Sequence, residues 1–166
     1  MASIRLRKDE DLAACVEVMK AVYETSGYPV AGVDNAAADL QTDDLAWVAE
    51  DGEGSVIGHV ALKEARTGNV GAALWWELHP GANIAVLGHL FVHPRSRGAG
   101  AGSRLVRTAE EEARRKGQRL IMFALVKDQD AIRLYRRLGW EHYGSVIYRW
   151  GEGNAMAAEC FASPVS

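Results

Sequence analysis

Residues 84–106 constrain the fold of this chain more than any other stretch. Residues 84–94 are almost entirely apolar and end at a proline, a pattern typical of a buried strand. Gly98, Gly100 and Gly102 follow, and an amphipathic helix then begins. A helix start leaves backbone N–H groups without partners and carries partial positive charge, and glycine lets an anion approach the backbone closely. The stretch therefore predicts a strand, a loop and a helix that bind phosphate.

The spacing of these glycines disfavours two common nucleotide sites. A Walker loop ends in Gly-Lys-Ser/Thr, and no such lysine follows here. The dinucleotide fingerprint Gly-x-Gly-x-x-Gly needs a third glycine where this chain has Ser103. A nucleotide-binding protein is therefore a distant alternative.

The pattern Arg97-x-x-Gly100-x-Gly102, preceded by Leu90-Phe-Val-His-Pro94, resembles the acyl-CoA pyrophosphate loop of the GNAT superfamily of N-acetyltransferases. A second stretch, residues 128–140, is similar to the closing motif of that superfamily, Asn-x-x-Ala-x-x-Leu-Tyr-x-x-x-Gly-Phe. The two motifs stand in the order that the family requires. Asp128 replaces the usual asparagine, and because a carboxylate cannot donate, a contact that needs the amide N–H is in doubt.

The resemblance implies one α/β (α+β) domain over residues 1–150. It would have a mixed, mostly antiparallel central sheet of about seven strands, with helices on both faces and a splayed, bulged fourth strand. The implied activity is that of an acyltransferase that moves acetyl from acetyl-CoA to a primary amine. Direct attack is favoured because neither Cys15 nor Cys160 lies near the motifs. The alternative is a catalytically inactive acyl-CoA-binding regulatory module on the same fold.

The same resemblance implies the residues that hold acetyl-CoA. Backbone groups of Leu90, Phe91 and Val92 would pair with the pantetheine amides. The diphosphate would be held by Arg97, Gly98, Ala99, Gly100, Ala101, Gly102 and Ser103, and Asp128 and Tyr135 would complete the cofactor contacts. The Tyr135 hydroxyl would protonate or hydrogen-bond the departing sulfur, although an amphipathic core tyrosine is the alternative.

The general base is less defined by the pattern. His89 lies beside the predicted bulge, and an imidazole titrates near neutral pH. Glu77, His59 and Glu50 compete with it, a water molecule could relay the proton, or no base is needed. The aromatic and acidic residues that would line the acceptor pocket, unless they belong to the core, are Tyr23, Glu24, Tyr28, Trp47, Trp75 and Trp76.

The remaining pattern predicts ordinary α/β elements. We expect strands at 4–7, 45–50, 55–62, 84–93 and 119–126, helices at 9–24, 34–40, 100–116 and 128–139, and a hairpin turn around Gly144. Residues 64–82 are expected to be a loop that covers the acceptor site or clasps the sheet edge. Residues 151–166 are expected to be a C-terminal tail of open role.

The charge distribution and the absence of long apolar runs limit the kinds of partner that we expect. The 166 residues carry a net charge of −3, with 6 Lys and Arg against 14 Asp and Glu in residues 1–83 and 13 against 8 in residues 84–166. This division suits an anionic cofactor held by the second half and a small-molecule or peptide amine attracted by the first. With neither a signal peptide nor a membrane-length apolar run, we expect a cytoplasmic protein with reduced cysteines, no metal, and neither nucleic acid nor membrane as partner. A homodimer is left open.

Overall fold

The computed structural model describes residues 2–165 of the chain. The strands are β1 (Ser3–Leu6), β2 (Leu45–Glu50), β3 (Val56–Glu64), β4 (Ile84–Val92), β5 (Arg119–Leu125), β6 (Glu141–Trp150) and β7 (Asn154–Ala162). The helices are α1 (Leu12–Ser26), α2 (Ala36–Gln41), α3 (Val70–Leu78), α4 (Ala101–Arg115) and α5 (Gln129–Arg137), with the short 3-10 helices η1 (Asp9–Asp11) and η2 (Pro94–Ser96).

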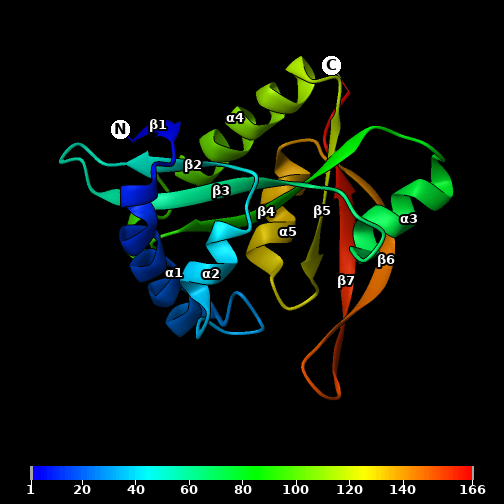
Figure 1. Cartoon of the computed structure of the whole chain (residues 1–166), viewed down its shortest axis with the longest axis horizontal. Coiled ribbons are helices and arrows are strands. Elements are labelled where there is room, and N and C mark those ends of the chain that lie inside the picture. Colours follow the sequence, from blue (N-terminus) through cyan, green and yellow to red (C-terminus); the bar gives the residue numbers. More distant parts are fainter. Residues whose placement is uncertain (1, 166) are drawn as a thin grey trace. The chain divides into compact units, whose positions relative to one another are not determined.

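Seven strands form one sheet in the order β1-β2-β3-β4-β5-β7-β6 (Figure 1). The pair β4–β5 is parallel, whereas β1–β2, β2–β3, β5–β7 and β6–β7 are antiparallel. The predicted mixed, mostly antiparallel sheet is therefore confirmed. No helix among residues 2–165 is long and apolar enough to cross a bilayer.

Contacts between residues divide the chain into two compact units. The first contains Met1–Lys63 and Leu87–Ala109, and the second contains Glu64–Val86 and Glu110–Ser166. Both β4 and α4 therefore contribute residues to each unit.

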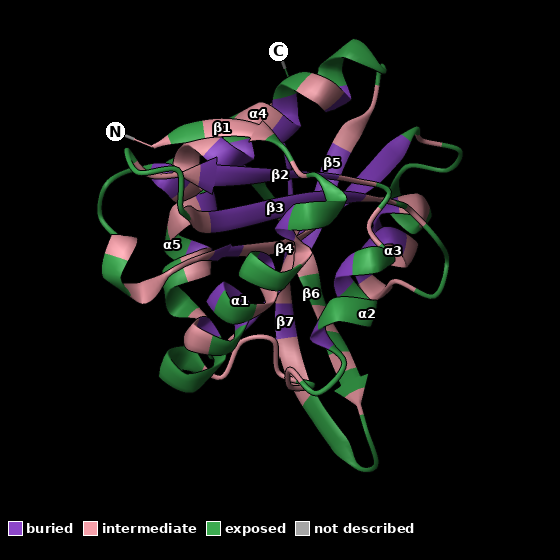
Figure 2. Cartoon of the chain, turned by 60° about the vertical axis from the view of Figure 1, so that its left-hand side comes forward, coloured by how far each residue is buried: buried purple, intermediate pink, exposed green. Residues whose placement is uncertain are grey.

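The core of the first unit is built by α1 and α2 against the sheet. Apolar side chains of α1 recur at helical spacing and bury one face of that helix. The buried members of this core are Cys15, Val18, Met19, Val22, Ala36, Leu40, Val48 and Phe91. Figure 2 shows β2 and β3 buried over most of their length. This packing holds the second half of β4, on which the predicted catalytic histidine lies.

The segment 64–82 differs from the prediction, because it contains the helix α3 instead of being all loop. The Asn69 side chain accepts a hydrogen bond from the Ala72 N–H at 2.9 Å and so caps the helix start. Trp75 and Ala72 are buried against Ile84 and Ile121 of the second unit. The helix is thus a packed part of that unit's core.

The C-terminal prediction is also corrected. The expected hairpin turn around Gly144 does not exist, since β6 runs unbroken from Glu141 to Trp150. The turn lies at 151–153, where Gly151 and Gly153 have φ of 56° and 75°. A Cβ atom at Gly144 would come within 2.7 Å of Leu74 on α3, so that glycine serves close helix packing.

The segment expected to be a tail contains β7, which pairs with β5 on one side and with β6 on the other. Phe161 and Cys160 of β7 are fully buried. The end of the β6–β7 hairpin, by contrast, is exposed (Figure 2). The last strand in the sequence is therefore an inner strand of the sheet.

Candidate active site

The segment after β4 is an open loop that leads into a helix. Gly98 and Gly100 have φ of 86° and 84°, in the left-handed region that favours glycine. A Cβ atom built on either residue meets no other atom within 4 Å. The backbone conformation thus favours glycine at both positions, and the space beside the loop is open. The contact with a diphosphate stays a prediction.

The first amides of α4 continue this loop. The first i→i−4 bond of the helix runs from the Arg104 N–H to the Gly100 carbonyl at 3.1 Å. The N–H groups of Ala101, Gly102 and Ser103 therefore precede the helical hydrogen-bond ladder and carry the positive end of the helix dipole. Arg97, Gly98 and Ala99 lie on the exposed part of the loop. The seven predicted diphosphate-binding residues, 97–103, therefore lie on this loop and on the first turn of α4.

The backbone of β4 is irregular at His89. The ladder to β5 joins three residue pairs and reaches Val86, whereas β4 continues to Val92. His89 has a φ of 48° and is the one non-glycine residue with positive φ among residues 2–165. The irregularity of the fourth strand, which was expected from the sequence, therefore falls on His89. Leu90, Phe91 and Val92 follow it directly, and the Phe91 ring stacks on the ring of His59 at 4.9 Å.

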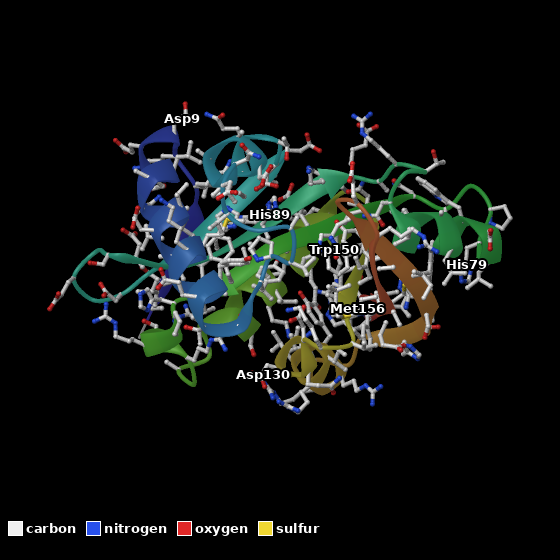
Figure 3. The ribbon with its side chains drawn as sticks, turned by 90° about the horizontal axis from the view of Figure 1, so that it is seen from below. Asp9, His79, His89, Asp130, Trp150 and Met156 are labelled. Atoms are coloured by element: carbon white, nitrogen blue, oxygen red, sulfur yellow. The ribbon has the colours of Figure 1, made fainter. Side chains whose placement is uncertain are left out.

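The His89 side chain is paired with a carboxylate. Its Nδ1 lies 2.8 Å from Oδ1 of Asp43. The side chain of Asp43 is fully buried, whereas that of His89 is 20% exposed. His89 is labelled in Figure 3. Because a carboxylate accepts, Nδ1 is the donor, and Nε2 of the neutral ring is left as a proton acceptor.

Two further side chains hold this pair. Arg7 Nη1 lies 3.2 Å from Asp43 Oδ2 and 2.9 Å from His59 Nε2, and its Nη2 donates to the Leu40 carbonyl at 2.9 Å. His59 Nδ1 donates to the His89 carbonyl at 2.7 Å. Burial is the main cause that lowers the pKa of His59 to about 4. His59 is therefore neutral at pH 7, with one ring nitrogen donating and the other accepting.

The structure also shows the surroundings of the three residues that compete with His89 as general base, namely His59, Glu50 and Glu77. His59 is fully buried and uses both ring nitrogens, so it has no free acceptor for a substrate proton. Glu50 forms an ion pair with Arg5 at 2.8 Å. Glu77 is an exposed residue of α3. Among these four candidates, His89 is the partly exposed imidazole that pairs with a buried carboxylate.

Tyr135 lies on α5 in the second unit and is 1% exposed. Its ring meets Trp140 edge to face at a centroid distance of 4.8 Å and lies 6.4 Å from Phe161. The indole N–H of Trp140 donates to Glu110 at 3.3 Å. The packing role that the sequence offered as an alternative is thus visible, and the role of the hydroxyl stays a prediction.

Asp128 occupies the N-cap position of α5, as expected from the sequence. Its side chain makes no capping hydrogen bond, however, and instead pairs with Lys127 Nζ at 2.8 Å. The carboxylate in place of the family's asparagine is therefore engaged with a neighbouring cation.

The residues expected to line an acceptor pocket have different surroundings. Trp47 and Trp75 are buried in the two units, and the Trp76 indole donates to the Ala82 carbonyl at 2.9 Å. Tyr28 packs against the core of the first unit. Tyr23 and Glu24 are exposed on α1. The tryptophans therefore act mainly as packing residues, and the two exposed side chains stay candidates.

Sequence reasoning missed Asp43 and Arg7. Asp43 follows α2 and precedes β2, and Arg7 follows β1, so neither belongs to a recognisable motif. The available signal was weak: each is a charged residue within two positions of the end of a strand. No group of three or more potential metal ligands occurs among residues 2–165.

Comparison with known sequences agrees with the geometry of this loop and helix. The model of the acetyltransferase (GNAT) family matches residues 11–140. An uncharacterized N-acetyltransferase of Methanocaldococcus jannaschii is 37% identical over 68 residues, which span 40% of this chain and 30% of the length of that protein.

Comparison with solved structures extends the likeness to the whole fold. An N-acetyltransferase from Staphylococcus aureus is 20% identical with a TM-score of 0.72, covering 98% of this chain and 97% of its own. A ribosomal-protein-alanine N-acetyltransferase from Brucella melitensis is 22% identical with a TM-score of 0.72, covering 98% and 99%. The protein yncA from Salmonella typhimurium, solved with its cofactor acetyl-CoA, is 20% identical with a TM-score of 0.69, covering 98% and 92%.

Proposed function

Because the chain belongs to the acetyltransferase (GNAT) family, we propose that it transfers acetyl from acetyl-CoA directly to a primary amine. The observation that carries this proposal is the loop at Gly98 and Gly100, whose left-handed backbone and open surroundings lead into the first amides of α4. The comparisons offer no support for the alternative of an inactive acyl-CoA-binding module.

The loop would hold the diphosphate of acetyl-CoA. The N–H groups of Ala101, Gly102 and Ser103 supply donors at a helix start, and Arg97 adds a full positive charge. Leu90, Phe91 and Val92 would offer backbone groups to the pantetheine amides. Their position on β4 beyond the ladder to β5 supports this assignment.

Direct attack by the amine is favoured over an enzyme-bound acetyl intermediate. Cys15 and Cys160 are fully buried, and burial raises the pKa of each thiol to about 11. A buried thiol that resists ionisation is a poor nucleophile. Free, buried cysteines also suit a reducing compartment, which supports the cytoplasm as the proposed location.

Two side chains would handle the protons of the transfer. The amine nitrogen forms a bond to the thioester carbonyl carbon, and the C–S bond breaks. His89 Nε2 would accept the proton that the amine loses, and the Tyr135 hydroxyl would donate a proton to the departing thiolate. The acidic excess of residues 1–83 supports an acceptor that arrives as an ammonium, either a small amine or a peptide amino group. The ammonium would lose one proton to solvent before the neutral nitrogen attacks.

The test combines binding with turnover. Calorimetry with CoA should detect association, and acetyl-CoA with a panel of polyamines, amino acids, aminoglycosides and peptides should release thiol and yield an acetylated product by mass spectrometry. Binding without thiol release for any amine would instead favour the inactive module. Absence of binding heat at millimolar CoA would contradict the cofactor assignment itself.

A further inference from the structure

The buried carboxylate of Asp43 has two different partners. Its Oδ1 lies 2.8 Å from His89 Nδ1, and its Oδ2 lies 3.2 Å from Arg7 Nη1. A buried carboxylate is tolerated when it is paired and hydrogen-bonded, and Arg7 meets that need. The contact to His89 is therefore an additional one, directed at a ring that is partly open to solvent.

We propose that Asp43 is a positioning residue that keeps the proton of neutral His89 on Nδ1, so that Nε2 is the proton acceptor of the transfer. The inference rests on the proposed role of His89 in acetyl transfer. A carboxylate beside one imidazole nitrogen selects the tautomer and fixes the plane of the ring.

The backbone of His89 is held independently of its ring. His59 Nδ1 donates to the His89 carbonyl at 2.7 Å, and Arg7 Nη1 contacts His59 Nε2 at 2.9 Å. The guanidinium of Arg7 therefore contacts both Asp43, which holds the His89 ring, and His59, which holds the His89 carbonyl. Its Nη2 is fixed in turn by the Leu40 carbonyl.

The strained backbone points to a purpose for this arrangement. His89 adopts a φ of 48°, whereas the adjacent Gly88 is not among the glycines with positive φ. A strand that merely needed a bend here would put the positive φ on Gly88, because glycine adopts positive φ without strain. Strain kept on a side-chain-bearing residue is typical of functional sites. Here it sets the direction of the imidazole.

The geometry makes Asp43→Asn an informative substitution. An amide presents one accepting oxygen and one donating nitrogen. Arg7 is a donor only, so the amide oxygen would turn toward Arg7 and the amide nitrogen toward His89 Nδ1. His89 Nδ1 would then have to accept, and its proton would move to Nε2. The substitution therefore reverses the tautomer and leaves the size of the side chain nearly unchanged.

The first measurement is independent of any acceptor. In ¹⁵N-labelled wild-type protein at pH 8, two-dimensional NMR of the imidazoles should show His89 protonated at Nδ1, with the signal assigned by its loss in His89→Asn. In Asp43→Asn the proton should lie on Nε2, and in the control Asp44→Asn the wild-type pattern should persist. A wild-type His89 protonated at Nε2, or an Asp43→Asn ring that stays protonated at Nδ1, would overturn the inference. Should Asp43→Asn not fold, the wild-type tautomer alone decides.

The second measurement uses an amine identified by the panel. The matching substitution in serine proteases lowers kcat by about 10⁴-fold through the wrong tautomer. Here we expect a fall in kcat on the order of 10²–10³-fold, with KM for acetyl-CoA changed less than about twofold. Equal kcat for wild type and Asp43→Asn would overturn the inference while leaving acetyl transfer intact. No transfer by the wild type to any amine would refute the proposed function instead, and the NMR result would still decide the tautomer.

Discussion

The two residues proposed to move protons, His89 and Tyr135, have opposite kinds of surroundings. His89 in the first unit is partly exposed, and it donates a hydrogen bond to Asp43 and accepts one from His59. Tyr135 in the second unit is buried and is held by aromatic packing against Trp140. Polar partners fix the protonation state and direction of a group, whereas packing fixes its place. A change at His89 should therefore alter chemistry first, and a change at Tyr135 should also cost stability.

The largest effect is expected from His89→Asn. Asparagine keeps a donor near the position of Nδ1 and tolerates positive φ, so the contact to Asp43 and the backbone are spared while Nε2 is lost. General-base catalysis contributes about 10²–10⁴-fold, and kcat should fall by that amount in the thiol-release assay. The exposed His79 on the other unit gives the control His79→Gln, which should leave kcat unchanged. Undiminished turnover in His89→Asn would remove this residue from the mechanism.

The second prediction tests whether the polar surroundings of His89 make the first unit sensitive to acid. Burial lowers the pKa of His59 to about 4 from 6.5, so the unfolded chain binds the proton first as the pH falls. The contribution of neutral His59 to the stability of the folded chain is present above pH 6.5 and is lost as the pH falls toward 4. Between pH 7 and pH 5 the free energy of unfolding should drop by about 2 kcal/mol through this residue.

Urea denaturation of wild type and His59→Asn at the two pH values measures this effect. Asparagine retains a donor near Nδ1 for the His89 carbonyl and does not titrate. The variant should be less stable at pH 7 and lose less stability at pH 5. An equal pH dependence in both proteins would show that His59 is not the acid-sensitive group.

Tyr135→Phe tests the other side of the comparison. The substitution keeps the ring packed against Trp140 and removes the hydroxyl. If the hydroxyl donates a proton to the leaving thiolate as proposed, kcat should fall about 10²-fold with little change in KM for acetyl-CoA. Tyr135→Ala, by contrast, should cost about 3–5 kcal/mol of stability. Wild-type kcat in the phenylalanine variant would assign Tyr135 to packing alone.

The smallest effect is expected from a substitution in the loop at residues 97–103, which contains neither His89 nor Tyr135. Alanine at Gly100 must adopt a φ of 84°, at a cost of about 1 kcal/mol, and should weaken acetyl-CoA binding measured by calorimetry. Gly52→Ala is the control, since Gly52 has neither positive φ nor an atom within 4 Å of its Cβ position. Equal CoA affinity in the two variants would show that the backbone conformation at Gly100 does not contribute to cofactor binding.

Local patterns were sufficient for most of the fold. Strands and amphipathic helices were predicted close to their observed bounds because their periodicity lies within a few residues of sequence. The helix α3 was missed because Val70–Leu78 is apolar on nearly every side and shows no helical stripe. The strand β7 was missed because its many alanines have low strand propensity. In both cases tertiary packing, absent from the local pattern, decides the structure.

The candidate site also contains one part that the local sequence predicts and another that depends on tertiary packing. The loop at 97–103 was predicted because its glycines and helix start are neighbours in sequence. Asp43 and His89 are 46 residues apart, and their contact depends on how α2, β2 and β4 meet. Glu110 pairs with Arg114 one helical turn away, yet it is 2% exposed and also accepts a hydrogen bond from Trp140. Long-range polar partners of this kind leave no periodic trace in a sequence.

The inner position of β7 has a consequence for biosynthesis. The ribosome makes β7 after the other six strands of the sheet. Before then β5 is paired with β4 on one edge only, and β6 has no paired neighbour among the described strands. Until residues 154–162 emerge, the nascent second unit exposes the edges of β5 and β6 that β7 later covers, and such unpaired edges are templates for association with other chains. Premature termination after Trp150 would therefore leave a chain that aggregates, even though every residue of the two family motifs had been translated.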